Sequence, residues 1–291
     1  MELNDLLSLH DIAPKDIVVM RHRPYELKLR KVLPWYAAEK PEIYNAYQSI
    51  HGPRVESSLQ HAKFIASFMG HQAGQALFVG LYKINGYKPI TYKEYWNIPA
   101  NKEMKKHGMV GWTKEENKET ALWFSLERTD FYKEWKGKLI VKWPPPERSW
   151  WRRAERNNIP IYAIKEESLL EAAMPDWDEL KLSWNELSLI PSTWKTILSQ
   201  WRGIYYIFDL SDGKGYVGSA YGADNILGRW QNYAHSGHGG NKFLVKRNPE
   251  NFTFSVLQRV SPDMEPKDVI TLEGKWKERL HTRSPLGLND N

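Results

Sequence analysis

The chain has 291 residues, about twice the common size of a single domain, so we expect two domains. Hydrophobic residues make up 41% and charged residues 26%, a balance that excludes disordered, collagen-like and membrane-spanning classes. The absence of cysteine excludes disulfides, thiolate nucleophiles and cysteine-bound zinc, and the net charge of +6 permits an anionic partner without requiring one.

The N-terminal segment does not have the pattern of a targeting sequence. MELNDLLSLHDIAPKD carries acidic residues where a secretory signal is basic, and its apolar run is short. No later run approaches the roughly 18 apolar residues of a spanning helix. We therefore expect a cytoplasmic protein with no membrane partner.

The first 195 residues predict a mixed α+β domain. Turns are expected at Asn85-Gly86 and at the three prolines 144–146. Helical spacing is present over residues 56–69 and 167–174. These features favour a curled sheet or a small barrel. Its strands are expected at residues 77–84, 121–127, 138–143 and 159–164.

A short helix over residues 192–201, beginning at Ser192, is expected to join this region to the next. No low-complexity linker separates the two. We therefore predict domains over residues 1–195 and 196–291.

The last 90 residues alternate between strand and helix patterns. Residues 203–210 and 214–221 flank Ser211-Asp212-Gly213, a turn signal, and predict a hairpin. A helix over 223–235, a strand over 252–260 and a helix over 268–281 follow. The predicted order is β-β-α-β-α around a small antiparallel sheet.

Residues 201–291 also carry an ordered set of motifs. Gly203-Ile204-Tyr205 and Tyr216-Val217-Gly218 are separated by ten residues, and further positions follow in order. On these residues the segment resembles the GIY-YIG nuclease family. The further positions that match the family are Arg229, Tyr233, Glu273 and Asn289.

The strand pairing of the hairpin can be predicted from its turn, independently of the family. If Asp212-Gly213 is the turn centre, Tyr205 pairs with Ala220, and Tyr205 and Tyr216 share one face of the sheet. Their offset of four residues corresponds to about 13 Å at ~3.4 Å per residue, too far for direct contact but close enough for the two phenol groups to converge above a gap. Gly218 would leave the gap between them open. Both tyrosines are also compatible with ordinary strand positions.

Arg229 and Tyr233 are four residues apart and share one face of their helix. A guanidinium there can bind a phosphate and offset charge during phosphodiester cleavage, although such a pair is also common on a solvated helix face.

Glu273 lies at the edge of the apolar stripe of the last helix, where a carboxylate must be paired or metal-bound. Magnesium and a salt bridge to Lys277 are the alternatives. Asn289 is expected to orient Glu273 or a phosphate, and Asn291 competes for that role.

The resemblance implies metal-assisted hydrolysis of a DNA phosphodiester. Tyr205 would accept a proton from the attacking water and Tyr216 would support that water. Magnesium on Glu273, for which Mn²⁺ may substitute, would stabilise the leaving oxygen. Because one such site cuts one strand, double-strand cleavage would need a homodimer or sequential nicks.

Tryptophan is unusually abundant, with 14 residues of which 11 precede residue 200. We interpret this region as the part that chooses the DNA target, through basic and aromatic residues that grip phosphates and stack on a base. The alternative is a tryptophan-filled core with a basic surface. The candidate DNA contacts are Arg148, Trp150, Trp151, Arg152, Arg153 and Lys242.

A second nuclease signature is suggested by Asp176 followed by Glu179-Leu180-Lys181, but only two residues separate its parts, which is too few for neighbouring strands. No phosphate-binding loop of nucleotide triphosphatases occurs. The leading hypothesis is a DNA endonuclease of restriction or host-defence type. A structure-selective repair or mobile-element nuclease and a non-cleaving DNA-binding protein remain as alternatives.

Overall fold

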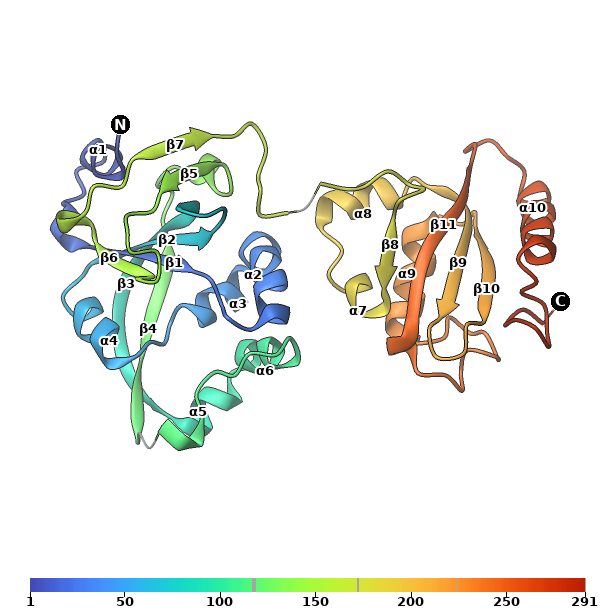
Figure 1. Cartoon of the computed structure of the whole chain (residues 1–291), viewed down its shortest axis with the longest axis horizontal. Helices are drawn as coiled ribbons and strands as arrows, with labels where there is room; N and C mark the ends of the chain where they lie inside the picture. The colour runs from blue at the N-terminus through green and yellow to red at the C-terminus, as the bar shows by residue number, and fades with distance from the viewer. Residues whose placement is uncertain (117–118, 172, 224, 291) are drawn as a thin grey trace. The chain divides into compact units, whose positions relative to one another are not determined.

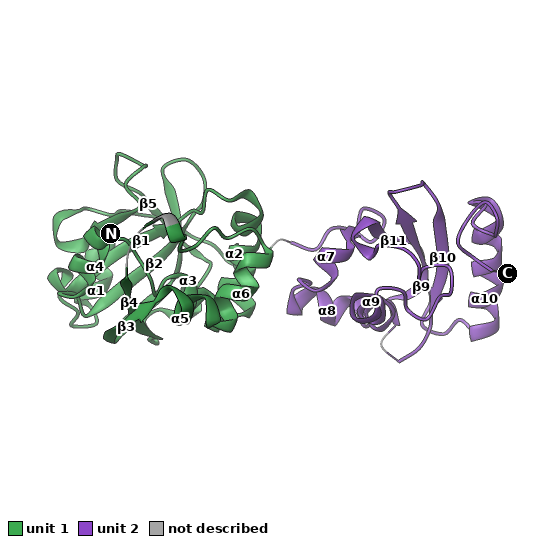
Figure 2. Ribbon diagram, turned by 90° about the horizontal axis from the view of Figure 1, so that it is seen from below, with its two compact units in different colours: residues 1–172 green, residues 173–291 purple. Residues whose placement is uncertain are grey.

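The computed structural model describes residues 1–116, 119–171, 173–223 and 225–290. The chain forms two compact units, Met1–Ala172 and Ala173–Asn291 (Figure 2). We call them unit 1 and unit 2 and describe each by itself. Within the described ranges, every helix is too short or too polar to cross a membrane.

Unit 1 is built on a seven-stranded sheet that curls into a half-barrel (Figure 1). The strand order is β6-β1-β2-β3-β5-β7, with β4 paired to β3. β1 and β2 are parallel and the other pairs are antiparallel. The strands are β1 (Ile17–His22), β2 (Phe64–Gly70), β3 (Gln75–Thr91), β4 (Thr120–Arg128), β5 (Leu139–Lys142), β6 (Trp151–Arg153) and β7 (Ile161–Ile164). The predicted mixed α+β class with a curled sheet is therefore confirmed.

The turn predicted at Asn85-Gly86 is wrong, because β3 runs through it. The pairing of β3 with β4 shifts between Ile84 and Tyr87, which marks a β-bulge, and Gly86 adopts a positive φ of 116° there. A bulge bends its strand and increases the local twist. The first part of β3 pairs with β2 and the later part with β4, so one long strand serves two parts of the curled sheet.

The helices of unit 1 only partly follow the prediction. The helix expected over 56–69 ends at Leu59, and residues 64–70 form β2 instead. A short apolar run cannot be assigned to helix or strand from periodicity alone, and pairing with β1 and β3 decides it. The described part of 167–174 contains no helix. The helices are α1 (Leu3–Ser8), α2 (Leu27–Glu39), α3 (Pro41–Tyr47), α4 (Pro53–Leu59), α5 (Tyr92–Asn97) and α6 (Pro99–Lys106).

Unit 2 contains a four-stranded antiparallel sheet of order β10-β9-β11-β8. The strands are β8 (Lys181–Ser183), β9 (Arg202–Asp209), β10 (Gly215–Ala220) and β11 (Phe252–Val260). The helices are α7 (Trp184–Leu187), α8 (Ser192–Leu198), α9 (Asn225–Ser236) and α10 (Pro266–Arg279). From β9 to α10 the order is the β-β-α-β-α order expected from the sequence, and the small antiparallel sheet is present.

The division between the units lies at residue 172 rather than at residue 195. Residues 173–195 belong to unit 2 because β8 pairs with β11 and because Leu180 and Leu187 are buried in its core. A three-residue strand gives too short a pattern to be found in the sequence.

The two faces of the unit 2 sheet are covered by different helices (Figure 1). Tyr205 and Ile207 on β9 face a core that includes Trp230 of α9. Ile204 and Val217 face the opposite way and pack against Val269 of α10. The candidate site is built where these two faces meet the edge strand β10.

Candidate active site

The hairpin of β9 and β10 sets the positions of the two motif tyrosines. Gly218 lies opposite Tyr205, and Tyr216 lies opposite Ile207. The predicted pairing of Tyr205 with Ala220 is wrong by two residues, because the turn centres on Ser211-Asp212 rather than on Asp212-Gly213. A shift of two preserves the face on which each side chain lies. Tyr205 and Tyr216 therefore share a face, as predicted.

The expected gap of about 13 Å between these tyrosines does not exist. Their ring centroids are 6.4 Å apart. A Cβ built on Gly218 would lie 2.4 Å from Tyr205 Oη and 2.5 Å from Tyr205 Cζ. The space beside Gly218 is therefore filled by the Tyr205 ring, and glycine is the residue that permits this contact.

A third tyrosine completes the cluster. Tyr233 of α9 lies with its hydroxyl 3.2 Å from the Tyr205 hydroxyl, in a hydrogen bond whose donor can be either group. Its ring centroid lies 6.1 Å from that of Tyr205 and 6.4 Å from that of Tyr216. Tyr205 and Tyr233 are buried, whereas Tyr216 is half-buried. We call Tyr205, Tyr216 and Tyr233 the tyrosine cluster.

Burial keeps two members of the cluster protonated. Burial raises the pKa of Tyr205 far above its ordinary value, the neighbouring Tyr216 adds to this, and the charge of Arg229 lowers it only in part. Burial likewise raises the pKa of Tyr233, together with Tyr205 and Tyr216. At neutral pH both groups are phenols that can donate a hydrogen bond.

Two charged residues on different helices, Arg229 on α9 and Glu273 on α10, influence the cluster electrostatically. Both charges act on the pKa of Tyr205, Arg229 lowering it and Glu273 raising it. The guanidinium of Arg229 is exposed on α9, one turn before Tyr233. An exposed guanidinium beside buried phenols can bind an anionic group that comes from solvent.

Glu273 is paired in this structure. Its Oε1 lies 2.7 Å from Nζ of Lys277, four residues later on α10, and its Oε2 accepts a hydrogen bond from Ser219 Oγ on β10. The side chains of Glu273 and Lys277 are 16% and 9% exposed. The salt bridge that the sequence offered as one alternative is therefore present.

Asn289 binds the backbone of β10. Its Oδ1 accepts a hydrogen bond from Val217 N at 2.9 Å, and its Nδ2 donates to Val217 O at 2.8 Å. The side chain is buried and acts as a strand partner at the free edge of β10, between Tyr216 and Gly218. Asn289 is therefore a positioning residue. Asn291, the competing candidate, lies outside the described residues.

One ion-pair network at the hairpin turn has no signal in the sequence. Arg247 Nη1 lies 2.6 Å from Asp209 Oδ2, and Arg247 Nη2 lies 2.8 Å from Asp212 Oδ2. Asp209 is 1% exposed. Because 35 or more residues separate the partners along the chain, only the fold reveals that Arg247 fixes the turn that leads into Tyr216.

The candidate DNA contacts in the first domain do not form one cluster. Arg148 and Trp150 line a cavity of unit 1. Arg152 on β6 donates to the carbonyl oxygens of Pro144 and Pro146 in the loop that precedes this strand.

The other three candidates are also held in place. Trp151 pairs with Met20 in the sheet, and Arg153 Nη1 lies 3.7 Å from Glu155 Oε1. In unit 2, Lys242 forms an ion pair with Asp290.

The described residues contain no group of three or more His, Asp or Glu side chains placed to hold a metal ion. Glu273 is the carboxylate that the sequence analysis assigns to a metal in unit 2. Comparisons with protein-family models, curated proteins and solved structures found no match for this chain.

Proposed function

We propose that unit 2 hydrolyses phosphodiester bonds in DNA as a magnesium-dependent endonuclease of restriction or host-defence type. One observation carries the proposal. Side chains from β9, β10 and α9 bring three tyrosine rings together, and the charges of Arg229 and Glu273 both act on Tyr205. A cation, a carboxylate and hydroxyl groups in one place are what phosphodiester hydrolysis requires.

Arg229 is the group we assign to the phosphate. Its guanidinium is exposed and presents several donors in a plane, which matches the oxygens of a phosphate. Its positive charge would offset the negative charge that develops on the phosphoryl oxygens as water attacks.

We assign the proton of the attacking water to Tyr216 rather than to Tyr205. The Tyr216 phenolate accepts a proton from the water as the water oxygen forms a bond to phosphorus. The bond from phosphorus to the 3′ oxygen breaks, and the 3′ oxygen leaves as an alkoxide that takes a proton from solvent. Burial opposes the phenolate at Tyr205, whereas Tyr216 is half-buried and reachable from solvent. Tyr205 and Tyr233 then hold Tyr216 and the water through their hydroxyl groups.

The residues present fit a magnesium ion held by one carboxylate. A carboxylate has about four lone-pair sites, and Glu273 uses one on each oxygen, for Lys277 and Ser219. Magnesium is commonly held by one or two carboxylates with several waters and substrate phosphates. When bound, it would stabilise negative charge on the leaving oxygen.

Target choice is assigned to unit 1, which holds most of the tryptophans. Two alternative functions are a structure-selective repair or mobile-element nuclease and a DNA-binding protein that does not cleave. Because one tyrosine cluster addresses one strand, a homodimer is one route to double-strand cleavage.

Nicking of supercoiled plasmid with magnesium tests the proposal. Glu273→Gln and Arg229→Ala should each lower the nicking rate by about 10²-fold or more, the effect of removing one group that stabilises transition-state charge. Glu278→Gln is the matched control, because Glu278 lies on the same helix with a side chain 71% exposed. It should nick like the wild type.

Thermal melting of each variant separates lost chemistry from lost folding. If Glu273→Gln nicks as fast as the wild type, the assigned role is wrong. If the wild type nicks no unmodified, modified or branched DNA, the nuclease proposal fails, and binding without cleavage would favour the third reading.

A further inference from the structure

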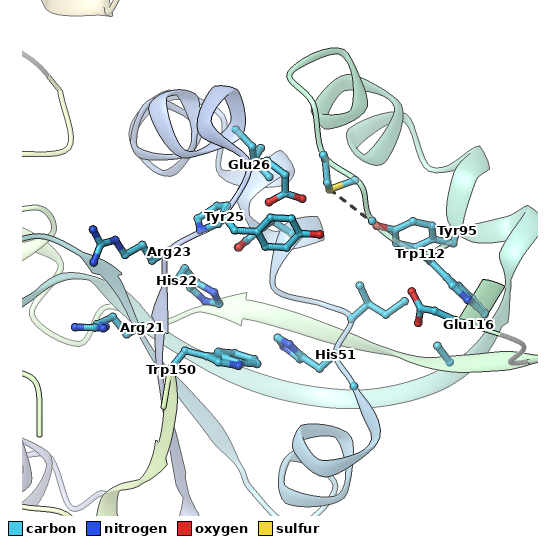
Figure 3. Close-up of a pocket in the computed structure, with 18 of the residues that line it drawn as sticks. Arg21, His22, Arg23, Tyr25, Glu26, His51, Tyr95, Trp112, Glu116 and Trp150 are labelled. Atoms are coloured by element: carbon cyan, nitrogen blue, oxygen red, sulfur yellow. Dashed lines mark hydrogen bonds between the residues drawn. The ribbon is translucent and has the colours of Figure 1, made fainter. Parts of the chain in front are cut away.

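Unit 1 contains a cavity of about 660 Å³ that the nuclease site does not use. It lies beside the end of β1 and is closed by α5 and by the segments around residues 50, 110 and 150 (Figure 3). Its volume is in the range of sites for small organic ligands. Its aromatic lining consists of Tyr25, Tyr47, Tyr95, Trp112 and Trp150, together with His22 and His51.

One side of this cavity is formed by three neighbouring flat rings, those of Trp150, His51 and His22. The His51 ring lies 5.6 Å from the Trp150 ring at 33°, and the His22 ring lies 6.4 Å from it at 38°. Trp150 is 37% exposed, so its ring is open to a ligand. Tyr25 and Glu26 lie across from these rings (Figure 3). A flat aromatic wall favours a ligand that is itself a flat ring.

The two histidines of this wall are uncharged at neutral pH. Burial lowers the pKa of His22 to about 3, with His51 adding to the effect, and burial lowers the pKa of His51 to about 4. His51 Nε2 is already bonded to the Gln48 carbonyl oxygen at 2.9 Å. His22 is 4% exposed, and its Nε2 has no hydrogen-bond partner within the described residues.

A buried ring nitrogen without a partner is costly unless a ligand supplies one. The ligand should therefore carry a hydrogen-bonding atom on its ring, which a hydrocarbon or a quaternary ammonium lacks.

The charges around the cavity balance. Arg21, Arg23 and Arg148 line it, and so do Glu26, Glu116 and Glu147, which gives three positive and three negative side chains among the described lining residues. Arg21 and Glu147 form an ion pair at 3.3 Å. A balanced lining selects a neutral ligand over an ion of either sign. Arg23 and Arg148 are exposed, which suits contacts to phosphates outside the cavity.

We propose that this cavity receives a neutral nucleobase turned out of a DNA duplex, stacked on Trp150 and hydrogen-bonded to His22. Turning a base out of the duplex costs its stacking and pairing, and an aromatic pocket that restacks the base offsets that cost. The choice of DNA over other sources of such a ring rests on the function proposed for unit 2. The inference that the ligand is a neutral flat ring with a hydrogen-bonding atom does not depend on that function.

The test measures binding of the full chain to fluorescent duplexes, with EDTA present so that no metal-dependent cleavage occurs. The duplexes share one sequence and differ at one central unpaired position, which carries A, C, G, T, 5-methylcytosine, 5-hydroxymethylcytosine or an abasic sugar. At least one base should bind about tenfold or more tighter than the abasic duplex, as expected for one stacked base.

Trp150→Ala should abolish this preference, and so should His22→Phe, which keeps a flat ring without its nitrogens. Tyr162→Ala is the matched control, because Tyr162 is an aromatic residue of unit 1 that is 53% exposed and does not line this cavity. It should keep the preference. Since Trp150 is partly exposed, its alanine variant should fold, and thermal melting checks this.

Equal binding of the abasic duplex and every base-bearing duplex would overturn the proposal, and so would an intact preference in Trp150→Ala. If free nucleosides bind in a Trp150-dependent way but duplexes show no preference, the ring chemistry is right and the DNA source is wrong. A chain that prefers a base but never cuts DNA refutes only the nuclease. A chain that cuts DNA but shows no preference refutes only the pocket.

Discussion

Gly218 is the position at which one added methyl group tests the tyrosine cluster directly. Tyr205 fills the space in which a side chain at residue 218 would lie, 2.4 Å from its hydroxyl oxygen. An ordinary contact for a Cβ begins near 3.4 Å. The substitution Gly218→Ala therefore requires the Tyr205 hydroxyl to move by about 1 Å, the difference between these distances.

That displacement has two consequences with expected magnitudes. Overpacking of a filled interior costs about 1–3 kcal/mol in the free energy of unfolding. A shift of about 1 Å in a group that positions the reactants can lower the rate about 10²-fold. The hydrogen bond between Tyr205 and Tyr233 would be strained by the same movement. We expect Gly218→Ala to be less stable and nearly inactive.

Gly274→Ala is the control for this prediction. Gly274 lies in α10 next to Glu273, and a Cβ there would meet nothing within 4 Å. Alanine should stabilise the helix by about 0.5–1 kcal/mol and leave cleavage unchanged. Urea denaturation and plasmid nicking measure the two effects. If Gly218→Ala is as stable and as active as the wild type, the contact argued for Tyr205 does not exist in solution.

Two further predictions concern other parts of the chain. Asn289→Ala leaves the N–H and C=O of buried Val217 unpaired, so we expect the free energy of unfolding to fall by about 2 kcal/mol or more and cleavage to weaken. Equal melting temperatures of the variant and the wild type would contradict the positioning role. Since burial lowers the pKa of His22 to about 3 and of His51 to about 4, the unfolded chain binds more protons than the folded chain between pH 4 and 6.5. The free energy of unfolding should therefore fall as the pH drops through that window, by about 2 kcal/mol for His22 alone at pH 5. If urea denaturation gives the same free energy of unfolding at pH 7 and pH 5, the burial of these imidazoles is refuted.

The sequence predicted unit 2 better than unit 1, for a physical reason. In unit 2 each element from β9 to α10 carries its own local signal, such as the turn at 211–213 and the alternation of β11. In unit 1, β1 is buried along its whole length, so it shows no alternation that a half-buried strand would have. The long β3 was divided at Asn85-Gly86 because a turn signal and a bulge use the same residues.

The candidate site was predicted as a set of residues but not as a geometry. A change of one residue in the turn centre moved the pairing by two, which brought Tyr205 and Tyr216 into contact. The sequence contains the period of two that keeps them on one face, but it does not contain the turn geometry. Long-range pairs such as Arg247 with Asp209 leave no periodic signal at all.

The cavity of unit 1 could not be predicted from the sequence at all. Its lining comes from segments spread between Arg21 and Trp150, and the aromatic residues among them look like core residues when each is considered alone. Trp143 is in fact a core residue, 3% exposed, whereas Trp150 seven residues later lines the cavity. Unit 1 therefore contains both core tryptophans and a cavity-lining tryptophan, and only the fold assigns each residue to one group.

The ion pair of Glu273 with Lys277 and the proposed metal site at Glu273 have the same physical cause. A largely buried carboxylate needs positive charge or hydrogen bonds, and Lys277 and Ser219 supply both when no cation is present. The contacts with Lys277 and Ser219 hold the Glu273 carboxylate on the β10 side of α10, and a cation must bind it there. The Glu273→Gln substitution also leaves the nearly buried ammonium of Lys277 without its ion-pair partner. A loss of activity in this variant therefore supports the catalytic role only if thermal melting shows that the fold is unchanged. Arg229→Ala removes an exposed charge and has no such ambiguity, so agreement between the two variants is the stronger argument for cleavage at this site.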